Sequence, residues 1–241
     1  MTKLDKPRQP PRFYKTVDVA PAGDRFGVVL DGRAARTPGG APLAAPSQAL
    51  ARLVADEWAA QGETIDMASM PATRLVFTVL DRTTEARQAM AEEVARYAGS
   101  DLLCYLAEDP QVLAEREAMV WGPWLTWADQ ALGVKLLPSI GIAPVRQSPD
   151  ALSRIAALAA EMDDFRLTGL TFAAALYGSA VLAFAVERGV LAGGEAYELS
   201  RLDEAFQEEQ WGIDDLARVR TETLRLDAAM IERWFAALRG G

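Results

Sequence analysis

The chain has 241 residues, half of them apolar, so it can bury a sizeable core, and its net charge of −9 argues against nucleic acid or an anionic membrane surface as a partner. It contains no histidine, which excludes Ser-His-Asp and Cys-His catalysis and histidine metal sites. Its one cysteine, Cys104, lies in the apolar run LLCYL; this excludes an intrachain disulfide, favours a small core residue over a nucleophile and fits a reducing compartment.

The first segments predict a polar tail followed by a small antiparallel sheet. Residues 1–12 are basic and proline-rich and lack the apolar core of a secretory signal, so we expect a flexible tail. The segments FYKTVDVA and RFGVVLDGRAART follow. In the second segment, Asp31 and Gly32 suit the central positions of a type I′ hairpin turn, because both tolerate positive φ. The PGG sequence at 38–40 then ends the sheet.

One amphipathic helix is expected next, over residues 48–61. Ser47 is a good N-cap for it, and Gly62 ends it. The following segment, ETIDMASMPATRL at 63–75, carries mixed signals, and we place the domain boundary there. The expected fold is α+β, with a flexible tail at 1–12, an α+β domain at 13–70 and an all-helical domain at 71–241.

The remainder of the chain has a helical pattern almost throughout. Asp109 and Pro110 look like an N-cap with proline in the first helical position. Residues 134–144, VKLLPSIGIAP, look extended and broken by proline. The helices predicted in this part span residues 84–97, 110–132, 150–162, 166–188, 194–211 and 214–238.

A long uncharged run, LTGLTFAAALYGSAVLAFAV at residues 167–186, is long enough to span a bilayer. It includes two glycines, two threonines, a serine and several alanines, so it is only weakly hydrophobic. We therefore predict the central buried helix of a helical domain, with no stable membrane insertion. A transmembrane segment is the alternative.

No motif of a known catalytic or cofactor site is present. The chain lacks a P-loop, a strand-GxGxxG-helix unit, CxxC, HExxH, GxSxG and an EF-hand loop, so we predict no metal or cofactor. Two pairs of acidic neighbours, Glu92-Glu93 and Glu208-Glu209, point in different directions on a helix and are predicted to be solvated.

The stretch SRLDEAFQEEQWG, residues 200–212, places an acid within an apolar stripe. At about 100° per residue, Asp203 and Gln210 fall inside the stripe, and Gln207 and Trp211 lie at its edge. The stripe consists of Ala196, Leu199, Leu202 and Phe206. An unpaired buried carboxylate is costly, so Asp203 needs a partner: an internal arginine, backbone N–H groups, or a residue of another protein.

The helix over 48–61 repeats this feature. Glu57 and Gln61 fall in its apolar sector, and Trp58 lies at the edge of that sector. Trp58 is predicted to pack in the core or between domains; an exposed aromatic anchor for a partner is the alternative.

These stretches carry a family resemblance. The chain resembles the assembly chaperones of the F-type ATP synthase catalytic head, of the type that holds the free α subunit. The matching stretches span most of the chain in the right order: RFYKTVDV, LDGRAARTPGGAPLAAPSQALA, ADEWAAQGETID, MPATRL, RYAGSDLLCY and SRLDEAFQEEQWG.

The resemblance implies a small α+β domain followed by a larger helical one, no enzymatic activity, and binding of the unassembled α subunit. It places function-sensitive positions on Asp203 and Trp58. Without a transit peptide the chain is expected to be a bacterial, cytoplasmic member, monomeric when free. The positions predicted to bind the client or to be function-sensitive are Asp203, Trp58, Gln207, Trp211 and Glu57. A generic helical holdase or scaffold, or an enzyme that uses carboxylates and arginines, are the alternatives.

Overall fold

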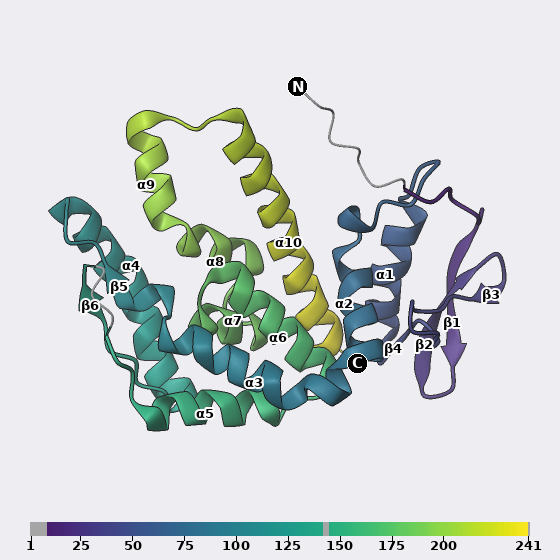
Figure 1. Cartoon of the computed structure of the whole chain (residues 1–241), viewed down its shortest axis with the longest axis horizontal. Helices are drawn as coiled ribbons and strands as arrows, with labels where there is room; N and C mark the ends of the chain where they lie inside the picture. The colour runs from purple at the N-terminus through teal and green to yellow at the C-terminus, as the bar shows by residue number, and fades with distance from the viewer. Residues whose placement is uncertain (1–8, 142–144, 241) are drawn as a thin grey trace. The chain divides into compact units, whose positions relative to one another are not determined.

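The computed structural model describes residues 9–141 and 145–240, and the contacts divide the chain into two compact units. The first runs to Asp81 and includes the last residues from Ala237 onward; the second spans Arg82–Ala236. The α+β class is confirmed: a small antiparallel sheet precedes a largely helical region (Figure 1). The expected domains at 13–70 and 71–241 stay a prediction.

The sheet of the first unit is built around β2 (Arg25–Leu30), which pairs antiparallel with β1 (Val17–Ala22), β3 (Arg33–Ala34) and β4 (Ala44–Ala45). Between β2 and β3, Asp31 and Gly32 have φ of 48° and 77°, as the predicted type I′ turn requires.

Two helices complete the first unit. Helix α1 (Gln48–Ala59) begins as predicted, since Ser47 Oγ accepts a hydrogen bond from Leu50 N–H at 3.1 Å. Within the expected connection, a 3-10 turn η1 (Met67–Ser69) leads into α2 (Pro71–Thr78). A π-helical turn, η2 (Val79–Thr83), follows α2. The mixed signals of residues 63–75 therefore cover the start of a helix.

Residues 9–12, the described part of the expected tail, are bonded to the loop after α1. Arg12 N–H donates to Glu63 O at 2.8 Å, and Pro10 O accepts from Ile65 N–H at 2.8 Å. The rest of the expected tail lies outside the described residues.

The second unit is mostly helical (Figure 1). Its α-helices are α3 (Thr84–Gly99), α4 (Gln111–Trp127), α5 (Pro149–Ala160), α6 (Asp164–Tyr177), α7 (Ala180–Glu187), α8 (Gly193–Ser200), α9 (Leu202–Trp211) and α10 (Asp215–Arg239). The short turns η3 (Leu102–Cys104) and η4 (Ala128–Leu132) flank or extend these helices. A two-residue parallel pair, β5 (Tyr105–Leu106) with β6 (Ser139–Ile140), is an addition to the expected all-helical pattern. The expected extended segment 134–144 includes β6, and its last three residues lie outside the described residues.

Two predicted helices are each split in the structure. The helix expected over 166–188 breaks at Gly178, whose φ of 62° ends α6, and Ser179 caps α7 through a hydrogen bond from Leu182 N–H. The helix expected over 194–211 breaks at Arg201, whose φ and ψ of −116° and 27° are not helical. Hydrophobic periodicity did not reveal either break, because apolar residues continue on both sides of Gly178 and of Arg201.

The apolar run lies in the core of the second unit, as predicted. Every residue of α7 is buried, and Cys104 is fully buried as well, which raises the pKa of its thiol to about 12. Among the described residues, none of the helices combines the length and apolar character needed to cross a bilayer.

The contact between α8 and α10 depends on a glycine. A Cβ added at Gly193 would lie 2.2 Å from the carbonyl oxygen of Ala228, whereas one added at the adjacent Gly194 would meet nothing within 4 Å. We expect Gly193→Ala to lower the free energy of unfolding by about 1–3 kcal/mol, because backbone must move to admit the methyl group. Gly194→Ala, the matched control, should be neutral or slightly stabilising. Urea unfolding of both variants measures this, and equal stabilities would contradict the close contact.

Candidate functional site

The acid in the apolar stripe meets a second acid. The carboxyl groups of Asp203, in the first turn of α9, and Glu117, in the middle of α4, face each other closely enough to form a hydrogen bond when one of them carries a proton. Trp121, one turn after Glu117, donates its Nε1–H to Leu199 O at 3.0 Å and so joins the end of α8 to the same helix. Helix α4 therefore holds both the α8–α9 junction and the start of α9.

This acid pair requires a proton. Glu117 is fully buried, and its Oε2 accepts a hydrogen bond from Ala107 N–H at 2.6 Å. Glu117 Oε1 and Asp203 Oδ1 are both buried, and neither receives a hydrogen bond from a donor in the described chain. Burial, together with the hydrogen bond and the charge of Asp203, raises the pKa of Glu117 from 4.5 to about 8. Near neutral pH, Glu117 is therefore the protonated donor and Asp203 the acceptor.

The need of Asp203 for a partner was predicted correctly, but neither predicted internal partner is the one found. The residue facing it is another carboxyl, where an arginine or backbone N–H groups were expected. The sequence analysis missed Glu117 altogether. A signal existed, since Glu117 lies four residues from both Leu113 and Trp121, which are buried on the same side of α4.

The acid pair makes stability depend on pH in a defined direction. Because the pKa of Glu117 is higher in the folded state, the folded chain binds more protons between pH 4.5 and about 8, and the free energy of unfolding falls as pH rises through that range. In Glu117→Gln, the amide can donate to Asp203 at any pH. We expect this variant to melt like the wild type near pH 5 and a few degrees higher above pH 8.

Thermal melts from pH 4.5 to 9 test this expectation. Glu115→Gln is the matched control, because Glu115 lies on the same helix, is exposed and bonds only the Gln111 side chain in the described contacts. If the melting temperature of Glu117→Gln falls with rising pH as steeply as that of the wild type, the shared proton is contradicted.

After Asp203, the exposed residues of α9 include polar and aromatic side chains. Gln207 and Gln210 are exposed, and Trp211, the last residue of the helix, is 80% exposed. Of the neighbouring acids predicted to be solvated, Glu209 is exposed and Glu208 is partly buried, and each forms an ion pair. Glu208 pairs with Arg201 at 2.5 Å and Glu209 with Arg116 at 3.0 Å.

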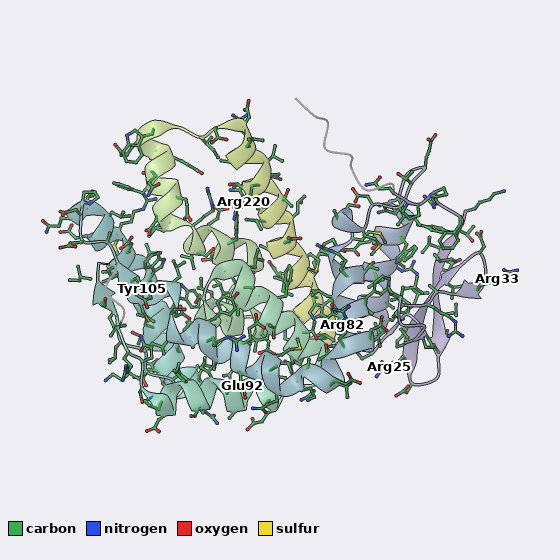
Figure 2. All side chains as sticks on the ribbon, in the orientation of Figure 1. Arg25, Arg33, Arg82, Glu92, Tyr105 and Arg220 are labelled. Atoms are coloured by element: carbon green, nitrogen blue, oxygen red, sulfur yellow. The ribbon has the colours of Figure 1, made fainter. Side chains whose placement is uncertain are left out.

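A cleft of about 600 Å³ lies beside α9 and is lined mainly by α6, α8, α9 and α10. Its polar lining includes the Arg201–Glu208 pair, Glu204 and Arg220, which is labelled on α10 in Figure 2. The cleft has charges of both signs, which suits a polar peptide surface better than a small apolar ligand.

In the first unit, Glu57 of α1 caps the start of α2. Its Oε1 accepts a hydrogen bond from Ala72 N–H at 2.8 Å, and its Oε2 accepts from Thr73 N–H and Thr73 Oγ1 at 2.8 and 2.7 Å. The N-cap residue of α2, Met70, offers no side-chain cap, so Glu57 supplies it from α1. Gln61 is bonded to this region too, through Ser69 and Asp66.

The packing prediction for Trp58 fits the structure, with the ring inside the first unit. The residue is 7% exposed, its ring centroid lies 5.6 Å from that of Tyr14, and its carbonyl accepts the Tyr14 hydroxyl at 2.7 Å. The alternative, in which Trp58 is an exposed aromatic anchor for a partner, does not fit a side chain that is this deeply buried. Roles of Trp58 and Glu57 in client binding stay predictions.

Removing the cap from α2 should destabilise the first unit. Glu57→Ala leaves Thr73, which is fully buried, with an unpaired hydroxyl and N–H. We expect a loss of about 2–3 kcal/mol. Asp56→Ala is the control, because Asp56 is the exposed neighbour on the same helix. Urea unfolding compares them, and similar stabilities for the two variants would exclude the capping role.

Comparisons with known proteins bear on both units. Residues 11–129 match the model of a family described as ATP12 chaperone protein. The chain is 23% identical to protein atp12, mitochondrial, of Schizosaccharomyces pombe, over 93% of this chain and 82% of the relative.

Solved structures are similar over nearly the whole chain. Atp12 from Paracoccus denitrificans shares 36% identity, covering 95% of this chain and 98% of that one, with a TM-score of 0.86. A structure of an aspartate-to-lysine mutant of the same protein also matches, with a TM-score of 0.86. A protein from Agrobacterium tumefaciens shares 38% identity over 95% of this chain and 86% of its own, with a TM-score of 0.89. The chain therefore belongs to the ATP12 family of ATP synthase assembly chaperones.

Proposed function

We propose that this protein binds the unassembled α subunit of the ATP synthase catalytic head and prevents its aggregation until the β subunit replaces it. It does so in the bacterial cytoplasm, as a monomer when free, and without catalysis. The family supplies the assembly role. The observation that carries client binding is the apolar surface that the end of the chain exposes.

That surface, here called the α9–α10 face, consists of Trp211, Leu216, Val219 and Leu226. Their exposed fractions are 80%, 84%, 66% and 63%. The three residues on α10 fall within about 80° of one another at 100° per residue, so they form one stripe. Exposed large apolar side chains that share one stripe of a helix, as the three on α10 do, often mark a protein contact, and Trp211 at the end of α9 adds a fourth exposed apolar side chain near the same end of the chain.

An isolated ring subunit is a fitting client for such a face. Its surfaces that belong against neighbouring subunits are exposed until those neighbours bind, and they are partly apolar. The chaperone must cover them and later release them. The α9–α10 face is flanked by charged side chains such as Arg218 and Glu222, so its contacts are mixed, which favours exchange over permanent binding.

The acid pair fits this proposal as a positioning device. Asp203 is partly buried and bonded to Glu117, while Gln207 and Trp211 follow it by one and two turns on α9. We therefore assign direct contact to Gln207 and Trp211, and assign Asp203 the placement of the helix that carries them.

The proposed client is tested with purified α subunit, which aggregates on dilution from denaturant. We expect light scattering to fall as this protein is added in equimolar amount, with or without ATP, while an unrelated aggregating client is much less protected. Equal protection of both clients would support the generic holdase, and protection that consumes ATP would overturn the mechanism.

The same assay assigns the surface. Trp211→Ser combined with Leu216→Ser should weaken protection severalfold without lowering the melting temperature, because both side chains are exposed. Val190→Ser is the matched control, since Val190 is a 54% exposed apolar residue outside the α9–α10 face. Full protection by the double variant would place the contact elsewhere.

A further inference from the structure

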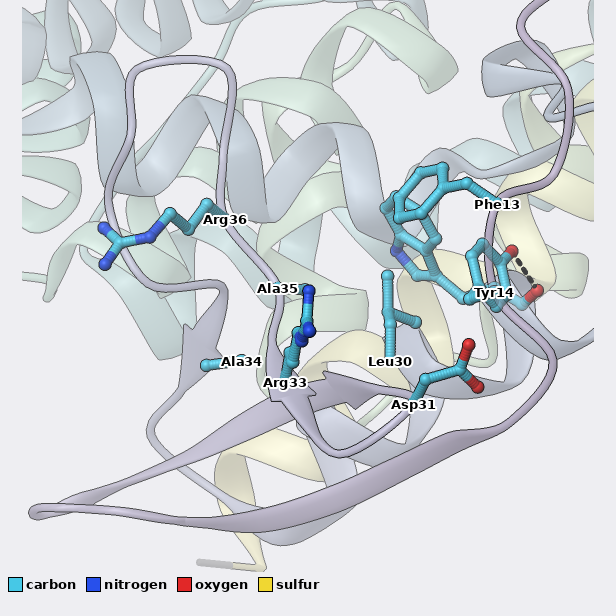
Figure 3. A pocket seen from close by; sticks show the side chains of 9 residues that line it. Phe13, Tyr14, Leu30, Asp31, Arg33, Ala34, Ala35 and Arg36 are labelled. Atoms are coloured by element: carbon cyan, nitrogen blue, oxygen red, sulfur yellow. Dashed lines mark hydrogen bonds between the residues drawn. The ribbon is translucent and has the colours of Figure 1, made fainter.

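A pocket in the first unit has no part in the α9–α10 face. It has a volume of about 590 Å³ and is lined by Phe13, Tyr14, Leu30, Asp31, Arg33, Ala34, Ala35, Arg36 and Trp58. Figure 3 shows the aromatic rings of Phe13 and Tyr14 on one side of Leu30 and the two arginines on the other. The pocket thus has an apolar floor, one aromatic wall and one cationic wall.

A polar group in the lining lacks its partner. Trp58 is 7% exposed, and its Nε1–H is buried without a hydrogen-bond acceptor in the described part of the chain. Leaving a buried donor unpaired costs about 1–3 kcal/mol. Phe13, which also lines the pocket, is 72% exposed, whereas the indole N–H of Trp58 is the buried, unpaired donor of the lining. A ligand that brings an oxygen atom would satisfy it.

The charges of the pocket favour an anionic ligand. Arg33 and Arg36 are exposed, and the only described bond of the Arg36 guanidinium is to Gly40 O. Asp31 is the one acid in the lining, and its carboxylate is already engaged by the N–H groups of Lys15 and Thr16 and by the Thr16 hydroxyl. These bonds lower the pKa of Asp31, so it stays negatively charged, and with Arg33 and Arg36 the lining keeps a net charge of +1.

The shape of the pocket favours an extended chain. β3 pairs with β2 along one side only and stands at the end of the sheet order β1-β2-β3. In a two-residue hairpin, Leu30 and Arg33 form the hydrogen-bonded pair, so the N–H and C=O of Ala34 point away from β2. An extended peptide can bond to such an edge while its side chains alternate between pocket and solvent.

We propose that this pocket binds an extended acidic segment of a protein client. One oxygen of the peptide accepts the hydrogen bond of Trp58 Nε1–H, an apolar side chain occupies the floor beside Leu30, and acidic side chains face Arg33 and Arg36. The proposal depends on the proposed function in one respect: the acidic segment is taken to belong to the client.

Binding is measured by fluorescence anisotropy with three labelled nonapeptides, in which leucine alternates with aspartate, with lysine or with serine. We expect saturable binding of the aspartate peptide and weaker binding of the other two. Arg33→Glu should weaken the aspartate peptide roughly fivefold or more. Arg52→Glu is the matched control, an exposed arginine of the same unit outside the pocket, and should bind like the wild type.

The unpaired donor is followed directly by NMR. The six tryptophans give six indole N–H signals, and the signal missing in Trp58→Phe identifies that of Trp58. Adding the aspartate peptide should shift this signal downfield, as a new hydrogen bond requires, and Trp58→Phe should bind more weakly while retaining a cooperative melt.

Three results would overturn the proposal: no saturable binding of the aspartate peptide, equal affinity for the aspartate and lysine peptides, or binding that leaves the Trp58 signal in place. The probes are synthetic, so the outcome is independent of the α-subunit assay. If the protein protects the α subunit but binds no acidic peptide, the proposed function stands and the proposed role of this pocket is wrong.

Discussion

The second unit depends on the complete burial of one short helix. α7 exposes none of its eight residues, so its polar ends must be bonded inside the protein. Ser179 caps its start, Asp101 accepts the N–H of Val181 at 3.1 Å, and Glu187 at its end pairs with Arg166 at 2.6 Å. Burial raises the pKa of Asp101 to about 6, so near neutral pH this carboxylate stays charged at the start of the helix. α6 and α8 pack on this fixed centre.

Helix α9 is held less firmly than α7. Leu202 is its only buried residue, and its contacts with α4 include the Glu117–Asp203 acid pair, which needs a proton, and the part-exposed Arg116–Glu209 ion pair. A pair of apolar side chains at the same position would need no proton, so its contribution to stability would not depend on pH. The acid pair instead makes the attachment of α9 to α4 weaken as the pH rises through the pKa of Glu117.

Each unit offers a different kind of contact. The α9–α10 face consists of large exposed apolar side chains, whereas the pocket of the first unit presents an unpaired donor and two arginines. One suits a preformed apolar surface of a folded subunit, and the other suits an extended acidic segment.

The sequence by itself determined the elements whose signals are local. The Asp31-Gly32 turn, the Ser47 cap, most helix positions and the burial of the 167–186 run were all predictable, because turn conformation, capping and hydrophobic periodicity act within a few residues. The ATP12 family was recognisable from the same stretches. Only the tertiary structure decided which groups meet. It broke two expected helices at Gly178 and Arg201, placed Glu117 against Asp203 from 86 residues away, and set Glu57 on the start of α2. Such pairings depend on how helices cross, and no local pattern encodes that crossing.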